Sequence, residues 1–173
     1  MACRVQLRRL RTGFTLVEML VVLAIMALLI LAAAPLTLHW VHGAHTAEAK
    51  SKLALAYEQA KALALRNPCS AYGTLAAATL KAELKGPTVH LTVLAGDAAS
   101  TVAQCPFLQA RPNPQWQTDL PSGVALHIQG TALTSSQAVL VPLDSRSGPL
   151  QGHTISYKLS KGSVSHDEVG TLK

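Results

Sequence analysis

Three histidines and one Ser-His-Asp run are the residues of this sequence that could support metal or catalytic chemistry. His39, His42 and His45 are spaced by three, so on a helix they would fan over about 120°, too wide an arc for one metal ion. Ser165-His166-Asp167 contains the residue types of a catalytic triad. Adjacent side chains of a strand point to opposite faces, however, and a triad is assembled from separate positions. We therefore expect no enzyme activity, no metal and no cofactor.

A single carboxylate, Glu18, lies at the front of a long apolar run. Met19 to Leu38 is 20 residues without a charge, and about 20 such residues span a bilayer as a helix. A carboxylate close to a bilayer is costly, by about 2.5–3.5 kcal/mol at the centre and less near the interface. The basic residues that precede the run, with no acidic residue among them, indicate a cytoplasmic N-terminus; they are Arg4, Arg8, Arg9 and Arg11.

Three interpretations of this N-terminus compete. An ordinary signal peptide would be cut near Ala32-Ala33-Ala34, whose small side chains suit such a site. A plain membrane anchor would never be cut. In the third interpretation the cut falls before the apolar run, which the mature protein retains. The first two give Glu18 no role, so we favour the third.

The segment Gly13-Phe14-Thr15-Leu16-Val17-Glu18 resembles the processing site of type IV prepilins and type II secretion pseudopilins. The resemblance implies that a prepilin peptidase cuts after Gly13 and methylates Phe14, the new N-terminus. It also implies an assembly role for Glu18, at the fifth mature position, and for Pro35, where family members often carry a helix-interior proline. Cleavage exposes a cationic amine on Phe14, which could pair with Glu18 of a neighbouring subunit because both charges are poorly solvated there.

One long helix is predicted from about Phe14 to about Arg66, where Asn67-Pro68 ends it. About 53 helical residues reach roughly 80 Å, far more than a bilayer, so the second half must stand outside the membrane. Its apolar residues recur at helical spacing, which predicts an amphipathic helix laid on a core; they are Leu53, Tyr57, Ala60 and Ala64. We expect Pro35 to bend or locally melt the helix.

The rest of the chain reads as strands separated by turns. Alternating, β-branched patterns predict strands over Val89–Leu94, Gly123–Gln129, Ala138–Leu143, Thr154–Leu159 and, at the end, Val164–Lys173. The segment Thr74–Leu84 is ambiguous because it is rich enough in alanine for a helix, and Gln104–Asp119, with three prolines, predicts an irregular loop.

The expected fold class is α+β and type IV pilin-like: a long N-terminal helix, half in the membrane and half in the periplasm, packed on a C-terminal antiparallel sheet. The expected divisions are a removed leader (1–13), a transmembrane and assembly helix (14–46), and a periplasmic domain (47–173) made of an amphipathic helix (47–66) and a sheet (67–173).

Two of the three cysteines remain after the predicted cut. Cys3 would leave with the leader, whereas Cys69 and Cys105 stay in a domain placed where disulfides persist. We predict a disulfide between them; the alternative is two separately buried thiols.

The C-terminal segment from Val139 to Lys173 is similar to the H-type minor pseudopilins of type II secretion and to the FimT-type minor pilins, in the order of its strands and glycines. The resemblance implies a minor pseudopilin held once across the bacterial inner membrane, with its C-terminal domain in the periplasm. Its partners would be the prepilin peptidase, other pseudopilins or minor pilins and the inner-membrane assembly platform.

Two alternatives to the pseudopilin remain: a minor type IV pilin for pilus assembly or DNA uptake, and an ordinary membrane-anchored periplasmic binding domain. Nucleic-acid binding is not expected. The candidate cations Lys158, Lys161 and Lys173 are interspersed with Asp167 and Glu168, whereas phosphate capture needs several uncompensated cations.

Overall fold

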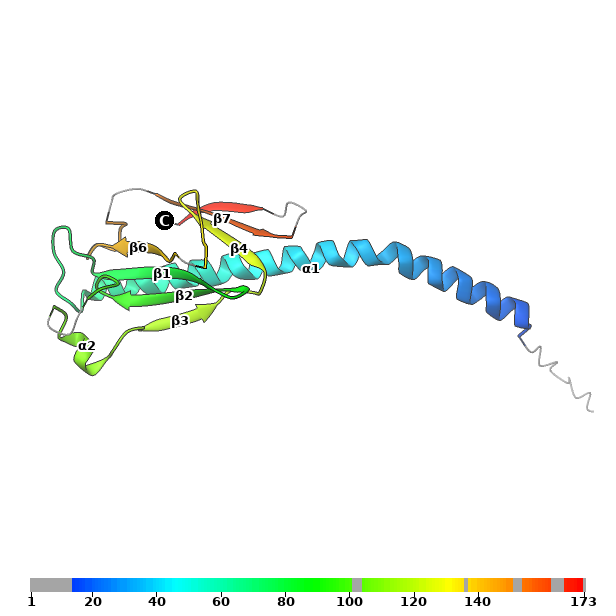
Figure 1. Cartoon of the computed structure of the whole chain (residues 1–173), viewed down its shortest axis with the longest axis horizontal. Coiled ribbons are helices and arrows are strands. Elements are labelled where there is room, and N and C mark those ends of the chain that lie inside the picture. Colours follow the sequence, from blue (N-terminus) through cyan, green and yellow to red (C-terminus); the bar gives the residue numbers. More distant parts are fainter. Residues whose placement is uncertain (1–13, 101–103, 136, 151–153, 163–166, 173) are drawn as a thin grey trace, which may run out of the picture. The chain divides into compact units, whose positions relative to one another are not determined.

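The computed structural model describes residues 14–100, 104–135, 137–150, 154–162 and 167–172, apart from the side chains of 34–39. The chain divides into two compact units, Met1–Trp40 and Val41–Lys173. Helix α1 (Leu16–Arg66) begins in the first unit and ends in the second (Figure 1). Both boundaries agree with the predicted helix to within two residues. The backbone stays helical through Pro35, so the helix does not melt there.

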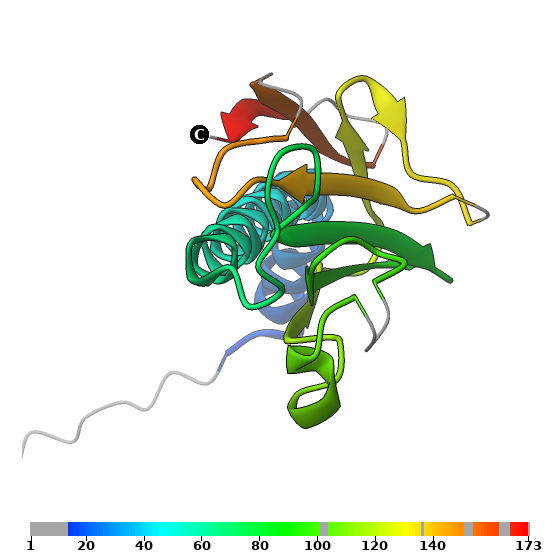
Figure 2. The same ribbon diagram turned by 90° about the vertical axis from the view of Figure 1, so that its left-hand side faces the viewer.

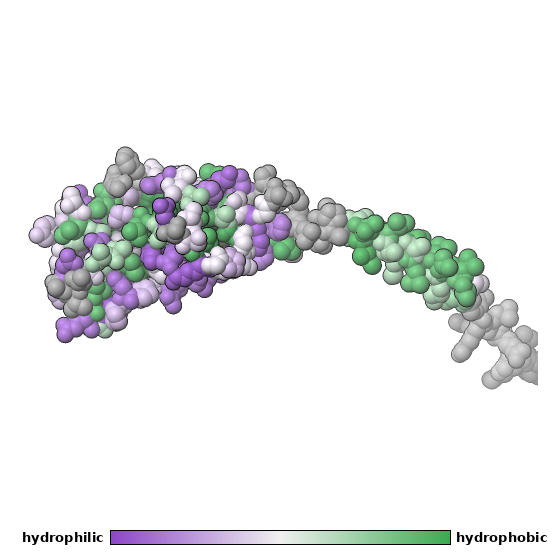
Figure 3. Space-filling model, in the orientation of Figure 1, coloured by the Kyte–Doolittle hydropathy of each residue, from purple (hydrophilic) through white to green (hydrophobic). Residues whose placement is uncertain are grey.

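The described part of the first unit is an apolar helix. Leu16–Ala33 is long and apolar enough to cross a membrane, with a mean hydropathy of 2.9, and none of it is buried within the chain. Apolar residues cover this stretch in the space-filling view (Figure 3). A helix that is apolar on all sides needs lipid or other helices around it.

In the second unit α1 is amphipathic. Leu53, Tyr57, Ala60 and Ala64, predicted to form the inner face, are at most 2% exposed. Small alanine side chains let the helix backbone approach the strands closely, while Leu53 and Tyr57 fill the space between them. The buried Thr46 hydroxyl donates a hydrogen bond to the carbonyl of Gly43 at 2.9 Å, as a buried polar group requires.

The described residues after α1 form eight strands, all paired antiparallel, in two four-stranded sheets. The first sheet has the order β3-β2-β1-β6, and the second has the order β5-β4-β7-β8. The strands of the first are β1 (Ala78–Lys85), β2 (Thr88–Ala95), β3 (Trp116–Asp119) and β6 (Val139–Leu143). Those of the second are β4 (Val124–Ile128), β5 (Thr131–Ala132), β7 (Ile155–Lys161) and β8 (Glu168–Leu172). The prediction of one sheet is thus refined: the fold class holds, but the strands are shared between two sheets.

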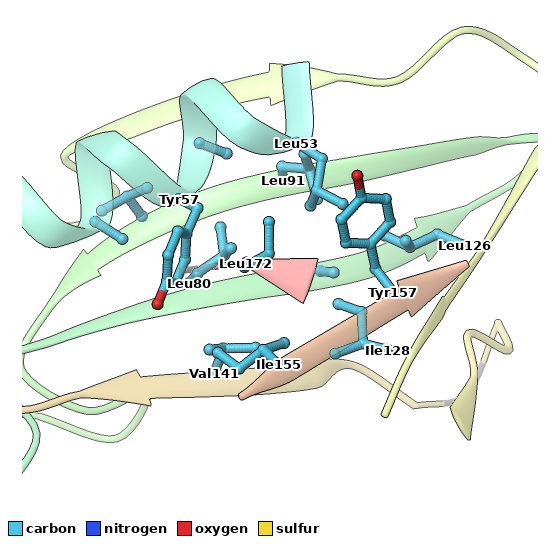
Figure 4. Close-up of a cluster of buried hydrophobic side chains, with 14 of the residues drawn as sticks. Leu53, Tyr57, Leu80, Leu91, Leu126, Ile128, Val141, Ile155, Tyr157 and Leu172 are labelled. Carbon is cyan, nitrogen blue, oxygen red and sulfur yellow. The ribbon is translucent and has the colours of Figure 1, made fainter. Parts of the chain in front are cut away.

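A single core joins these sheets to the C-terminal half of α1. Leu53 from the helix, Leu80 and Leu91 from the first sheet, and Leu126 and Ile155 from the second belong to one buried cluster. Figure 4 shows side chains from the helix and from both sheets converging on this cluster, and Figure 2 shows β1 and β2 beside the cyan half of α1, with β7 and β8 on another side of it. The second unit therefore has its own hydrophobic core.

One stretch was left open by the sequence, and another differs from its prediction. The ambiguous Thr74–Leu84 belongs to β1 from Ala78 onward, because it pairs there with β2 on one side and β6 on the other, and such tertiary pairing overrides helix propensity. The predicted irregular loop contains the short helix α2 (Phe107–Ala110) and strand β3. The Asn113 side chain stabilises this stretch by accepting from the Ala95 amide at 2.8 Å and donating to the Ala95 carbonyl at 3.2 Å.

Candidate assembly site at the start of the apolar helix

The first turn of α1 is capped by its own sequence. Thr15 precedes the helix, and its Oγ1 accepts a hydrogen bond from the backbone N–H of Glu18 at 3.2 Å. The Thr15 carbonyl accepts from the N–H of Met19, also at 3.2 Å. The Thr15 side chain therefore satisfies one of the backbone donors that the first turn leaves free, and its carbonyl accepts the first hydrogen bond of the helix. We did not predict this cap, although Thr-x-x-Glu before an apolar run is a recognised helix-start pattern.

Glu18 presents a carboxylate at this end of the helix. It lies exposed in the first turn of α1, where the positive end of the helix dipole favours a negative charge. Within the described part of the chain, no cation pairs with it. A carboxylate that borders an apolar surface without an ion-pair partner is available for a cation supplied by another molecule.

Phe14 lies two residues before the helix, and its side chain is 72% exposed. It is therefore accessible at the point where the predicted mature chain would begin. Gly13, the residue before the predicted cut, falls outside the described residues. Pro35 is helical in its backbone, and its side chain also falls outside the described residues, so the predicted bend is not tested.

The predicted disulfide is present: Cys69 and Cys105 are bonded, with their Cα atoms 4.5 Å apart. The alternative of two separate thiols is therefore wrong. Cys105 is buried together with Ala95 and Leu108, and Leu63 of α1 packs against the same cluster. The bridge thus joins the segment that follows α1 to the segment that leads into α2.

The turn between α1 and Cys69 is closed by one side chain. The Asn67 carboxamide accepts from the N–H of Ala71 at 2.7 Å and donates to the Ala71 carbonyl at 2.9 Å. Asn67 itself has a φ of 42°, a left-handed conformation that asparagine tolerates better than most residues. This accounts for the helix ending at Arg66, where the Asn-Pro pair predicted it.

The other residues considered as cation, catalytic or metal sites either form contacts within the chain or lie outside the described residues. Lys158 pairs with Asp167 at 2.7 Å, and Lys161 donates to the Ser122 carbonyl at 3.0 Å, so neither lysine is a free cation. Ser165, His166 and Lys173 are not among the described residues. Across the ranges described above, no three His, Cys, Asp or Glu residues gather as metal ligands would.

Surface ion pairs shift the pKa values of several groups in the second unit. Lys50 on α1 donates to Glu168 on β8 at 2.9 Å, and this hydrogen bond raises the pKa of the Lys50 amine. On β1, hydrogen bonds from Lys81 and then Lys85 lower the pKa of the Glu83 carboxyl to about 2. Exposed pairs of this kind contribute little stability individually, but they leave these charges engaged within the chain.

A family model described as the prokaryotic N-terminal methylation motif matches residues 8–34, which include Gly13, Phe14 and Glu18. No curated protein and no solved structure matches the chain. The motif implies processing by a prepilin peptidase, assembly with other pilin-type subunits and anchoring by one membrane-spanning helix. The chain therefore carries the methylation motif of a type IV prepilin-like precursor on an α+β, type IV pilin-like arrangement of helices and antiparallel sheets.

Proposed function

We propose that this chain is a minor pseudopilin of a type II secretion system, cut after Gly13, methylated on Phe14 and incorporated into a short periplasmic filament that drives protein export. Its role is mechanical, with no catalytic residue of its own. The observation that carries the proposal is the Glu18 carboxylate in the first turn of an apolar helix, within the matched methylation motif and without a cation partner among the described residues.

The proposed assembly chemistry is an ion pair between subunits. After the cut, the amine of Phe14 is a cation about one helical turn from Glu18 of the same chain. In a bundle of such helices, Glu18 of one subunit accepts hydrogen bonds from the Phe14 amine of the next. The apolar stretch Leu16–Ala33 supplies the dry surroundings in which an unpaired charge is most costly.

The proposed location follows from the same features. The helix lies in the bacterial inner membrane, and the second unit lies in the periplasm. The Cys69–Cys105 disulfide supports an oxidising compartment for that unit. The H-type assignment rests on the order of glycines and strands in the C-terminal segment, and the partners are the prepilin peptidase, companion subunits and the inner-membrane platform.

Mass spectrometry of the membrane-extracted protein tests the first step. We expect the mature chain to begin at Phe14 and to carry one methyl group. A chain that retains Met1, or begins near Pro35, would refute the proposal and favour an ordinary anchored domain or a cleaved signal peptide.

Glu18→Ala tests the pairing step. We expect the variant to remain membrane-bound and cut at Phe14 but to enter filaments at least 100-fold less, because removing one partner of a buried ion pair costs about 3–5 kcal/mol. Glu48→Ala is the matched control, since Glu48 forms an exposed pair with Lys52. Equal incorporation of both variants would contradict the pairing. In strains lacking the chain, loss of export supports secretion, whereas loss of DNA uptake would favour the minor-pilin alternative.

A further inference from the structure

A hollow of about 360 Å³ lies between the end of α1, strand β2 and the segment from α2 to β3. Apolar side chains and two arginines line it, and we call it the arginine pocket; these residues are Leu63, Arg66, Val93, Phe107, Arg111 and Trp116. Val93 is buried and the two aromatic side chains are half-buried. The pocket therefore combines an apolar lining with two guanidinium groups.

Neither guanidinium group has a partner among the described residues. Arg66 and Arg111 are exposed, and neither side chain has an ion pair or hydrogen bond within the part of the chain that the structure describes. The lysines of the described ranges differ, because each contacts a carboxylate or a backbone carbonyl. Two uncompensated guanidinium groups beside an apolar hollow favour a ligand with both carboxylates and apolar side chains.

The carboxylates of the second unit are already engaged. Each of its eight Asp and Glu side chains is bound to a lysine, a histidine or groups of its own turn. For example, Asp144 accepts from the N–H groups of Arg146 and Gly148 at 2.9 Å each. A second copy of this unit would have to break such contacts to supply an acidic side chain. The complementary charge is therefore better supplied by a different polypeptide.

The pocket is held in place by the disulfide. Arg66 is the last residue of α1, and Phe107 and Arg111 follow Cys105 closely in the sequence. Because Cys69 is bonded to Cys105, the two segments that carry the arginines are joined covalently three residues after Arg66 and six before Arg111. Such preorganisation lowers the entropic cost of binding.

We propose that the arginine pocket binds an acidic, apolar-containing segment of a companion filament subunit, with Arg66 and Arg111 taking its carboxylates and Trp116 contacting its apolar side chains. The source of the segment, a filament subunit, rests on the proposed function. The preference of the pocket for an acidic, apolar segment does not rest on it. Single-stranded nucleic acid fits less well, since it needs a track of cations and exposed aromatic faces, whereas here two cations flank half-buried rings.

Fluorescence of Trp116 in the detergent-solubilised full chain, with Trp40→Phe to remove the other tryptophan, measures binding directly. The probe is a nine-residue peptide that alternates Asp or Glu with Leu, compared with the same peptide carrying Asn and Gln. We expect the acidic peptide to bind and the neutral peptide to bind at least tenfold more weakly. Arg66→Gln and Arg111→Gln should each weaken binding of the acidic peptide about tenfold.

Arg146→Gln is the matched control, because Arg146 is an exposed arginine outside the pocket, and its binding should equal that of the parent. Four results would each overturn the proposal. The two peptides could bind equally, or the Arg66→Gln/Arg111→Gln double variant could bind the acidic peptide as well as the parent does. Arg146→Gln could weaken binding as much as the pocket variants do, or an oligothymidylate of nine nucleotides could displace the peptide. The assay needs neither cleavage nor filament assembly. If the peptide does not bind, the proposed function is therefore unaffected. If the mature N-terminus is not Phe14, the proposed function fails, but the peptide binding measured at the arginine pocket still holds.

Discussion

Removing the Cys69–Cys105 bridge should lower the free energy of unfolding of the second unit by about 4 kcal/mol. The two cysteines are 36 positions apart, so the bridge closes a loop of about 37 residues, and the chain-entropy model gives about 4 kcal/mol for a loop of that length. The loop contains all of β1 and β2, half of the first sheet. In the unfolded chain, the bridge therefore restricts a segment that would otherwise move independently.

The double variant Cys69→Ala/Cys105→Ala isolates this effect. Alanine is preferable to serine because Cys105 is 1% exposed, and serine would bury a hydroxyl group there. Urea unfolding of the detergent-solubilised chain, followed through Trp116 with Trp40→Phe in both proteins, gives the difference in free energy. For a unit of this size we expect Tm to fall by roughly 10–20 °C. Cys3→Ala is the control and should leave both quantities unchanged, since Cys3 lies in the segment proposed to be removed.

A loss below about 1 kcal/mol would refute the reasoning, because the bridge would then add little to the restriction of the unfolded chain. An equal loss in Cys3→Ala would also contradict it, since that change leaves the Cys69–Cys105 bridge in place. Thiol counting under denaturing conditions should find no free thiol in the mature wild-type protein and two after reduction.

Two further predictions concern the sheets. Gly170→Ala should destabilise the second unit by about 1–3 kcal/mol, because an added Cβ would lie 2.7 Å from Cζ of the buried Tyr157 ring, its cross-strand partner. Thermal unfolding measures the loss. Gly43→Ala is the control and should stabilise the unit, since its added Cβ would meet nothing within 4 Å. Glu83→Gln should be less stable than the wild type at pH 7, and the two should converge as the pH falls from about 4.5 to about 2. This direction follows because a carboxyl whose pKa is lowered in the folded state stabilises above its unfolded pKa and loses that contribution through its folded pKa. A difference that stays constant across this range in urea unfolding would contradict it.

The N-terminal part of the candidate site was largely predictable from the sequence. The apolar run and Glu18 are local features, and local sequence was enough to predict a helix from about Phe14 to about Arg66, within two residues of the observed Leu16–Arg66. The inner face of the helix was predictable for the same reason, since residues four apart on a helix share a face. The threonine cap was missed although its signal was present in four consecutive residues.

The sheets show the limit of that approach. Val89–Leu94 was recognisable because it alternates, whereas β1 was ambiguous because its alanines favour a helix when considered alone. Only pairing on both sides, with β2 and β6, makes that stretch a central strand. Strand β3 has four residues beside several prolines, and it forms where the Asn113 amide joins the loop to Ala95.

The sequence by itself determined the helix, its apolar face, the charge at its start and the two cysteines available for a bridge, because each depends on residues close together along the chain. Tertiary structure alone decided that the strands form two sheets around one core. It also decided that Arg66 and Arg111, 45 positions apart, line the same hollow without acidic partners among the described residues. The physical reason is that pairing and pocket formation depend on which segments meet in space, and on which charges have already been neutralised there.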